Sequence, residues 1–357
     1  MNRNAWGGHW CAALLCAALL LVAVLGYAAQ TTAPVMAPGK GPAPELLDAL
    51  RTYPHRIVFE TYRHTNFEIF MVNADGSNPV NLTNTPAVDE LYPKASPDGK
   101  RLCFVADEGT GKEKSRNLYL MDLNGTGRTL IATNAREPCW SADGRFISYL
   151  KGEFNRFDLS DFATKGLFIY DVLTGETRAH PNPNLLHLYC LNLSPDGQWY
   201  VATVHGGMGY KHAILAFSAT DERVFDLRLS GCRPDLSPDG RRVAWGHGDW
   251  AIGVADLDFS SGTPKATGVR NVVQSADPVK TYHADWSPDG RYIAFSSGDK
   301  LEGRTVGGAP EFPGVQAPGW DICVADTTQP NHWVRITLDG ASDKEPDWVP
   351  ASGAGRE

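Results

Sequence analysis

The sequence predicts an all-β protein, a six-bladed β-propeller of four-stranded antiparallel blades that is closed by the C-terminal strand. Three observations lead to this prediction: a turn motif recurs at intervals of 45, 53, 43 and 50 residues, β-rich runs flank the copies, and the two ends of the chain complement each other. Repeats of about 40–50 residues that contain several short strands are typical of propeller blades.

The turn motif explains the hairpins. It reads Ser-Pro-Asp-Gly and begins at Ser96, Ser194, Ser237 and Ser287, with the variant Ser-Ala-Asp-Gly at Ser141. Proline fixes φ at the second position, aspartate hydrogen-bonds nearby backbone, and glycine accepts the left-handed conformation that reverses the chain. A second hairpin follows in the repeats, for example residues 118–123 and 128–133 around an Asn-Gly-Thr-Gly turn. Each repeat is therefore predicted to form four antiparallel strands.

The ends of the chain predict how the ring closes. Residues 56–59 match residues 101–104, so they form the second strand of a first blade whose innermost strand has no candidate upstream. The missing strand is found at the far end, where Glu-Pro-Asp-Trp-Val at 345–349 repeats the Glu-Pro-Cys-Trp-Ser pattern at 137–141. Pairing of the two ends would leave no open sheet edge, which favours closure by the C-terminus.

The chain is divided into four parts. Residues 1–28 combine Arg3, the apolar stretch 12–25 and a small-residue site, which predicts a secretory signal peptide and a periplasmic or secreted protein. A retained membrane anchor is the alternative, because residues 10–29 are long enough to span a bilayer. Residues 29–55 form an N-terminal segment with a short helix within 44–52, residues 56–350 form the propeller, and residues 351–357 form a flexible tail.

The repeats resemble those of TolB-type propellers, a group of WD40-like repeat proteins. The likeness is carried by Ser-Pro-Asp-Gly-Arg, by Trp two residues before the proline, and by the strand-then-Asp-Gly hairpin at 71–77, and it covers about residues 56–350. It implies the fold, whereas the same repeats serve binding proteins, peptidase accessory domains and some lyases. TolB itself carries an α/β domain ahead of its propeller, for which residues 29–55 are too short, so a link to the Tol system stays open.

The expected binding surface is the channel mouth opposite the Asp-Gly turns. The position just before each innermost strand gives a ring there, and the long loops, among them 151–165 with Phe154 and Phe157, open on the same face. Long loops of mixed aromatic and charged composition suit partner contact. The predicted binding residues are Tyr92, Glu137, Arg233, His283, Glu345, Phe154 and Phe157, with Cys190 completing the ring.

The predicted function is a non-enzymatic binding or scaffold protein of the envelope, monomeric, with a protein or glycan partner. Membrane contact is expected only if the N-terminal segment is retained. The net charge of −8 argues against nucleic acid, and no Gly-x-Ser-x-Gly elbow or following hydrolase domain supports peptidase chemistry. No cofactor is predicted. The alternative is a metal-dependent polysaccharide lyase, similar to oligogalacturonate lyase, with its metal held by His205, His247 and His283.

The cysteines predict no disulfide framework. Five remain after the signal segment, an odd number, and Cys103, Cys139 and Cys323 lie inside apolar runs. Cys190 and Cys232 could still pair.

Overall fold

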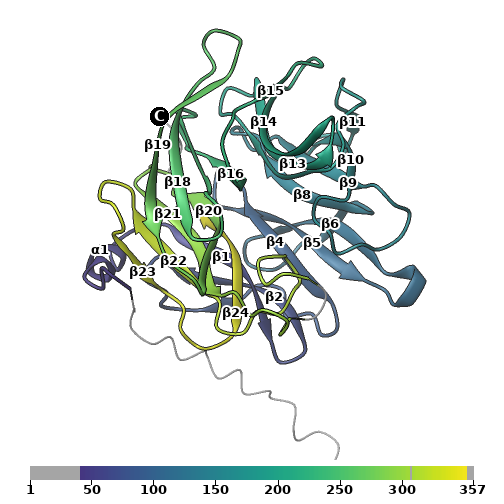
Figure 1. The fold of residues 1–357 in the computed structure, drawn as a ribbon. Helices are drawn as coiled ribbons and strands as arrows, with labels where there is room; N and C mark the ends of the chain where they lie inside the picture. Colours follow the sequence, from purple (N-terminus) through teal and green to yellow (C-terminus); the bar gives the residue numbers. More distant parts are fainter. Residues whose placement is uncertain (1–40, 306–307, 352–357) are drawn as a thin grey trace, which may run out of the picture. The chain divides into compact units, whose positions relative to one another are not determined.

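The computed structural model describes residues 41–305 and 308–351, and these residues form six four-stranded antiparallel sheets (Figure 1). The predicted signal peptide, most of the N-terminal segment and nearly all of the tail lie outside the described residues. Innermost strands of successive sheets contact one another all the way round and back to the first. The predicted six-bladed propeller is therefore confirmed.

Blades one to three are built from strands of two to eight residues, numbered along the chain. Blade one, ordered from the channel outward, is β24 (Ser342–Val349), β1 (Arg56–Arg63), β2 (Asn66–Asn73) and β3 (Val80–Asn81). Blade two is β4 (Asp89–Ala95), β5 (Arg101–Glu108), β6 (Ser115–Asp122) and β7 (Thr129–Ala132), and blade three is β8 (Ala135–Trp140), β9 (Phe146–Gly152), β10 (Thr164–Asp171) and β11 (Thr177–Ala179). A 3₁₀ turn, η1 (Gly111–Glu113), interrupts the β5–β6 loop.

Blades four to six repeat the plan. They are β12 (Leu188–Leu193), β13 (Trp199–Gly207), β14 (Tyr210–Ser218) and β15 (Val224–Asp226); β16 (Cys232–Leu236), β17 (Arg242–Gly246), β18 (Ala251–Asp258) and β19 (Lys265–Gln274); and β20 (Val279–Trp286), β21 (Tyr292–Asp299), β22 (Asp321–Asp326) and β23 (Trp333–Arg335).

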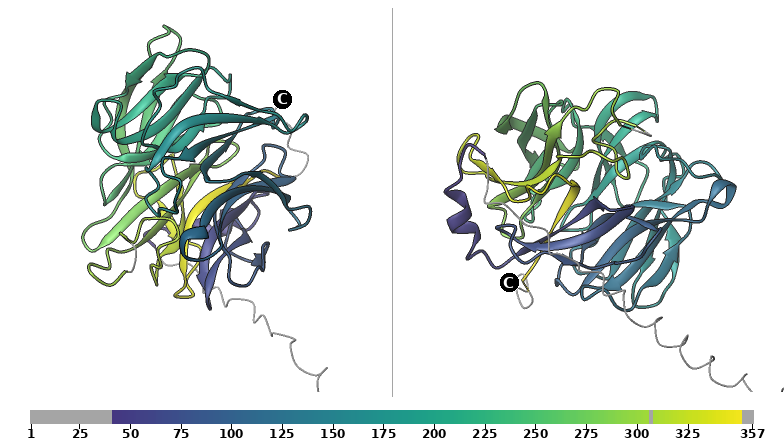
Figure 2. Two further views of the ribbon diagram at one scale, coloured as in Figure 1. Left: turned by 90° about the vertical axis from the view of Figure 1, so that its right-hand side faces the viewer. Right: turned by 90° about the horizontal axis from the view of Figure 1, so that it is seen from below.

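The two ends of the propeller meet in blade one. Strand β24 pairs antiparallel with β1, from Arg56 opposite Val349 to Tyr62 opposite Ser342. Figure 2 shows the yellow end of the chain beside the purple β1. The sequence prediction of C-terminal closure is confirmed, and the innermost position of the first sheet is filled.

The repeated turns form as the motif predicts. In the first copy the hydroxyl of Ser96 donates to Asp98 Oδ1 at 2.6 Å, and the N–H of Gly99 donates to the Ser96 carbonyl at 2.8 Å. Gly99 has φ +66°, which glycine adopts without a Cβ penalty. The same serine-to-aspartate bond recurs at Ser141, Ser194, Ser237 and Ser287.

Helix α1 (Leu46–Leu50) lies inside the segment for which the sequence predicts one. Its leucines pack into a core shared by blades one and six, together with Phe59, Tyr292 and Trp348. Burial of apolar side chains between blades is the main stabilising term for such a ring. No helix within the described residues is long and apolar enough to cross a membrane.

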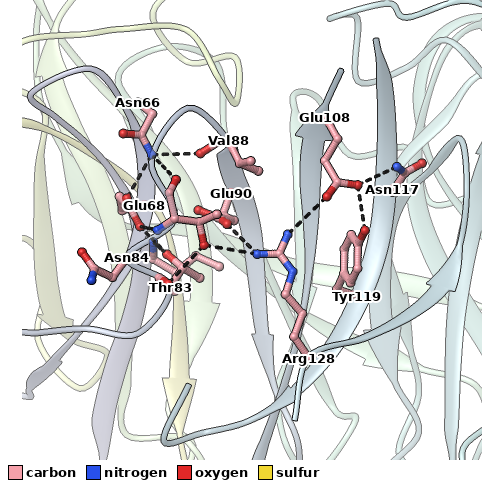
Figure 3. A network of polar contacts seen from close by, with 12 residues as sticks. Asn66, Glu68, Thr83, Asn84, Val88, Glu90, Glu108, Asn117, Tyr119 and Arg128 are labelled. Carbon is pink, nitrogen blue, oxygen red and sulfur yellow. Dashed lines mark hydrogen bonds and ion pairs between the residues drawn. The ribbon is translucent and has the colours of Figure 1, made fainter. Parts of the chain in front are cut away.

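A polar network supports the junction of blades one and two (Figure 3). Asn66 of blade one donates to the Val88 carbonyl at 2.9 Å, just before β4. In blade two, Arg128 donates to Glu90 at 2.7 Å and lies 3.8 Å from Glu108. Burial raises the pKa of Glu90 to about 7, although Arg128 works in the opposite direction. The junction therefore holds buried charge in fixed pairs.

Candidate functional site: a channel closed at one mouth and open at the other

A β-bulge occurs at the same place in all six innermost strands. The ladder shifts register there, and the bulged residue has φ between +50° and +59°; these residues are Tyr92, Glu137, Cys190, Arg233, His283 and Glu345. Positive φ is uncommon outside glycine, and bulges commonly redirect side chains beside functional sites. The prediction that this ring lies just before the innermost strands is wrong: the six residues lie within those strands, because each strand continues through its bulge.

The bulges surround a small internal chamber of about 40 Å³. The side chains of Tyr92, Glu137 and His283 are all buried, and His283 Nδ1 has no hydrogen-bond partner among the described residues. Burial raises the pKa of Glu137 to about 7 and lowers that of His283 well below its usual value. The chamber has space for water, and His283 Nδ1 is a polar atom there that still needs a partner.

The mouth on the loop side is closed by an ion pair. Arg233, in β16, donates to Asp161 of the β9–β10 loop at 2.5 Å and to Glu345 at 2.9 Å. The five ring residues predicted to contact a partner are therefore only 3–9% exposed. The guanidinium stays charged, because its neighbouring acidic groups outweigh the effect of burial and raise its pKa well above the usual value.

A second loop covers the same side. Lys344, fully buried in β24, donates to the carbonyls of Pro310, Phe312 and Val315 in the segment between β21 and β22. The N–H of Gly314, in the same segment, donates to Glu60 Oε1 at 3.3 Å. Backbone carbonyls thus hold a buried ammonium, which fixes the loop over the channel.

The opposite mouth is an open funnel of about 370 Å³ on the side of the Ser-Pro-Asp-Gly turns. Its walls carry Trp140, Trp286 and Trp348, and the turn prolines form part of the rim. Four charged residues of its lining stand in innermost strands: Lys94, Asp235, Asp285 and Asp347. Lys94 and Asp235 also line the inner chamber, so the funnel leads to it.

The four charged residues are tightly arranged. Lys94 Nζ lies 2.9 Å from Asp347 and 3.4 Å from Asp285. Burial lowers the pKa of Lys94, but the neighbouring aspartates outweigh it and raise the pKa well above its usual value. Burial raises the pKa of Asp235 to about 7 and that of Asp285 well above its usual range. An additional cation in the funnel would favour the ionised carboxylates.

Each aspartate also reaches the next blade. Asp235 accepts from the N–H of Trp286 at 2.8 Å, Asp285 from that of Trp348 at 2.9 Å, and Asp347 from that of Ala95 at 2.7 Å. These bonds fix the carboxylates and the adjoining tryptophans in one geometry, because charge-assisted hydrogen bonds are short and strong.

Sequence reasoning missed these four residues. They stand two positions after the bulged residue in their strands, where the other blades carry Cys139 and Asn192. A charged side chain at a position expected to be buried is the signal that could have identified them.

The loop-side residues are distributed as follows. Phe154 is exposed at 39%, while Phe157 is partly buried beneath Lys114, whose Nζ lies 4.3 Å from its ring centre.

No group of three potential ligands among His, Cys, Asp and Glu is close enough to hold a metal within the described residues. His205 contacts His212, His247 contacts Asn271, and His283 lies 3.1 Å from Glu345. Cys190 and Cys232 are free thiols, as are the other three described cysteines.

Comparison with known proteins shows that the fold is similar to that of TolB propellers. The structure is similar to TolB from Acinetobacter baumannii, with a TM-score of 0.60 and 17% identity over 83% of this chain and 67% of that one. It is also similar to a putative TolB from Agrobacterium tumefaciens, with a TM-score of 0.53 and 17% identity over 83% and 99% of the two chains. The predicted resemblance is confirmed.

Two curated relatives match in sequence. A TolB homolog of Chlorobaculum tepidum is 40% identical over 80 residues, which is 22% of this chain and 17% of that protein. Dipeptidyl-peptidase 5 of Porphyromonas gingivalis is 25% identical over 340 residues, which is 78% of this chain and 49% of that protein. The chain thus spans half or less of these relatives, and no family model matches it.

Proposed function

We propose that this protein is a non-enzymatic binding module of the periplasm or cell envelope, and that its funnel holds a protruding, positively charged segment of a protein partner. The observation that carries the proposal is the asymmetry of the channel. Loops and buried ion pairs close one mouth, whereas the other is open and about 370 Å³ in volume. A ligand segment would therefore enter from the side of the turns.

The chemistry of the funnel favours a cationic tip. Three aspartates face one lysine, so an arginine or lysine side chain would supply the missing positive charge. The tryptophan walls offer apolar surface to the stem of such a side chain. Arg101 and Arg242 of this chain already lie over the rings of Trp140 and Trp286. Aromatic residues in a pocket also provide most of the energy in typical interfaces.

The periplasmic location and the protein partner are supported by the likeness to TolB-type proteins, together with the signal-like N-terminal sequence. The loop-side residues Phe154 and Phe157 remain a predicted second contact surface. A glycan partner is less well supported, since the charged groups of the funnel are already oriented by backbone and ion-pair contacts suited to a cation.

Tryptophan fluorescence tests the proposal directly, because Trp140, Trp286 and Trp348 line the funnel. The protein should respond to a capped Gly-Arg-Gly peptide and not to Gly-Glu-Gly. The double substitution Asp285→Asn and Asp347→Asn should weaken binding of the arginine peptide at least tenfold, which corresponds to about 1.4 kcal/mol. Asparagine retains an acceptor for the neighbouring N–H groups, which helps to keep the fold intact.

Capture of the natural partner distinguishes the two faces. Envelope extract should yield the same partner with the wild type and with Phe154→Ala/Phe157→Ala, and less with Asp285→Asn/Asp347→Asn. If the phenylalanine variant loses the partner and the aspartate variant retains it, the funnel is not the binding site.

A further inference from the structure

We propose that His205 and His212 form a binding site for a divalent transition metal at the loop-side end of blade four, separate from the funnel. His205 lies in β13 and His212 in β14, on the two sides of one hairpin. This pair differs from the three histidines that the sequence suggests, of which only His205 takes part. The proposal does not depend on the proposed partner function.

The positions of the two imidazoles suit chelation. The residues are directly opposite each other in the strand register, and both side chains are exposed. Their Nδ1 atoms lie 3.2 Å apart. Two imidazole nitrogens on one tetrahedral zinc ion, each about 2.05 Å from the metal, are about 3.4 Å apart. Little side-chain movement is therefore needed for both nitrogens to reach one ion.

The surroundings orient both rings. His212 Nε2 lies 3.0 Å from the carbonyl oxygen of Gly231, which can only accept, so Nε2 carries the proton and Nδ1 presents its lone pair. Metal-binding histidines commonly donate their other N–H to such a carbonyl. The ring of Phe162 lies 4.6 Å from that of His205 and limits its rotation.

The protonation of the pair also allows metal binding. In the metal-free pair, His205 Nδ1–H donates to His212. On binding, His205 moves that proton to its Nε2 through solvent, which it can do because the ring is exposed.

Imidazole pairs suit zinc, copper and nickel rather than calcium or magnesium. Two protein ligands leave coordination positions for water or for a donor from another molecule. The site would then resemble an open metal site more closely than a closed structural one.

Calorimetric titration of the untagged protein with zinc chloride tests this inference. We expect one equivalent of zinc to bind to the wild type. Either His205→Ala or His212→Ala should weaken the zinc affinity at least tenfold. Affinity should fall as the pH is lowered from 7.5 to 5.5, because protons compete for the same nitrogens. His64→Asn is the matched control, since His64 is another exposed histidine at a hairpin and should leave the affinity unchanged.

Copper spectroscopy gives a second readout. The electron paramagnetic resonance spectrum of the copper-loaded wild type should show two coordinating nitrogens, and that of either alanine variant should not. In the presence of chelator, the melting temperature of both variants should stay within about 2 °C of that of the wild type, because substitutions at exposed positions change stability little. The inference would be overturned if the wild type did not bind zinc, or if both folded variants bound zinc with the affinity of the wild type.

Discussion

Arg233 of blade five and Asp161 of the blade-three loop form an ion pair of 2.5 Å that crosses the loop-side mouth of the channel. Both side chains are almost completely buried. The contact joins segments 72 residues apart and covers the internal chamber. It also separates the two faces of the propeller, because a ligand can enter from the turn side while this pair holds the other side closed.

Breaking this pair should be costly. We expect Arg233→Met to lower the free energy of unfolding by about 3–5 kcal/mol, because it leaves Asp161 buried without its partner. Urea denaturation measures the change. Arg241→Met, at an exposed turn, should change stability by less than about 0.5 kcal/mol. Equal stability of the two variants would show that the pair does not hold the loop.

Closure of the ring gives a second prediction. Deletion of residues 345–357 removes most of β24 and exposes the edge of β1. Because an unpaired edge is a template for association, the shortened protein should aggregate or melt far below the wild type. Deletion of residues 352–357 retains all of β24 and serves as the control. Light scattering and thermal melting of both proteins check this, and unchanged melting of the longer deletion contradicts it.

The chamber should make stability depend on pH through Glu137. Its pKa is raised to about 7 by burial, above the ordinary value of about 4.3, so the folded state holds the proton more tightly than the unfolded one. The resulting stabilisation is present at acid pH and is lost as the pH rises through about 7. Glu137→Gln should therefore gain stability relative to the wild type between pH 5 and pH 8, by up to about 3 kcal/mol.

Unfolding at several pH values measures this difference. The matched control is Glu176→Gln, at an exposed position. Its difference from the wild type in the free energy of unfolding should not change with pH across this range. A flat difference for Glu137→Gln as well would mean that the chamber does not retain the proton.

Two glycines of the same turn motif should respond differently to alanine. Gly99 and Gly197 have φ of +66° and +70°, so both substitutions carry the same backbone penalty, about 1–2 kcal/mol. A Cβ at Gly99 would lie 2.2 Å from the Pro350 carbonyl oxygen, whereas a Cβ at Gly197 meets nothing within 4 Å. Gly99→Ala should therefore destabilise by at least twice as much as Gly197→Ala in urea denaturation. Equal losses would show that the chain end does not pack on this turn.

The sequence by itself determined the fold. Local physics at each Ser-Pro-Asp-Gly copy dictates a hairpin, and the match between residues 345–349 and 137–141 identifies the closing strand. Both features depend on short-range conformational preferences repeated along the chain, and these can be counted without coordinates. The same alignment identified Tyr92, Glu137, Arg233, His283 and Glu345 as one ring.

Tertiary structure decided which end of the channel is open. Asp161 and Lys344 lie far apart in the sequence, and their buried contacts with Arg233 and with the Pro310, Phe312 and Val315 carbonyls depend on how two loops fold across the ring. Lys94 and the three aspartates come from four different blades, so their arrangement depends on ring closure. Burial and long-range charge pairing determine the ionisation of these groups, and neither can be read from local sequence.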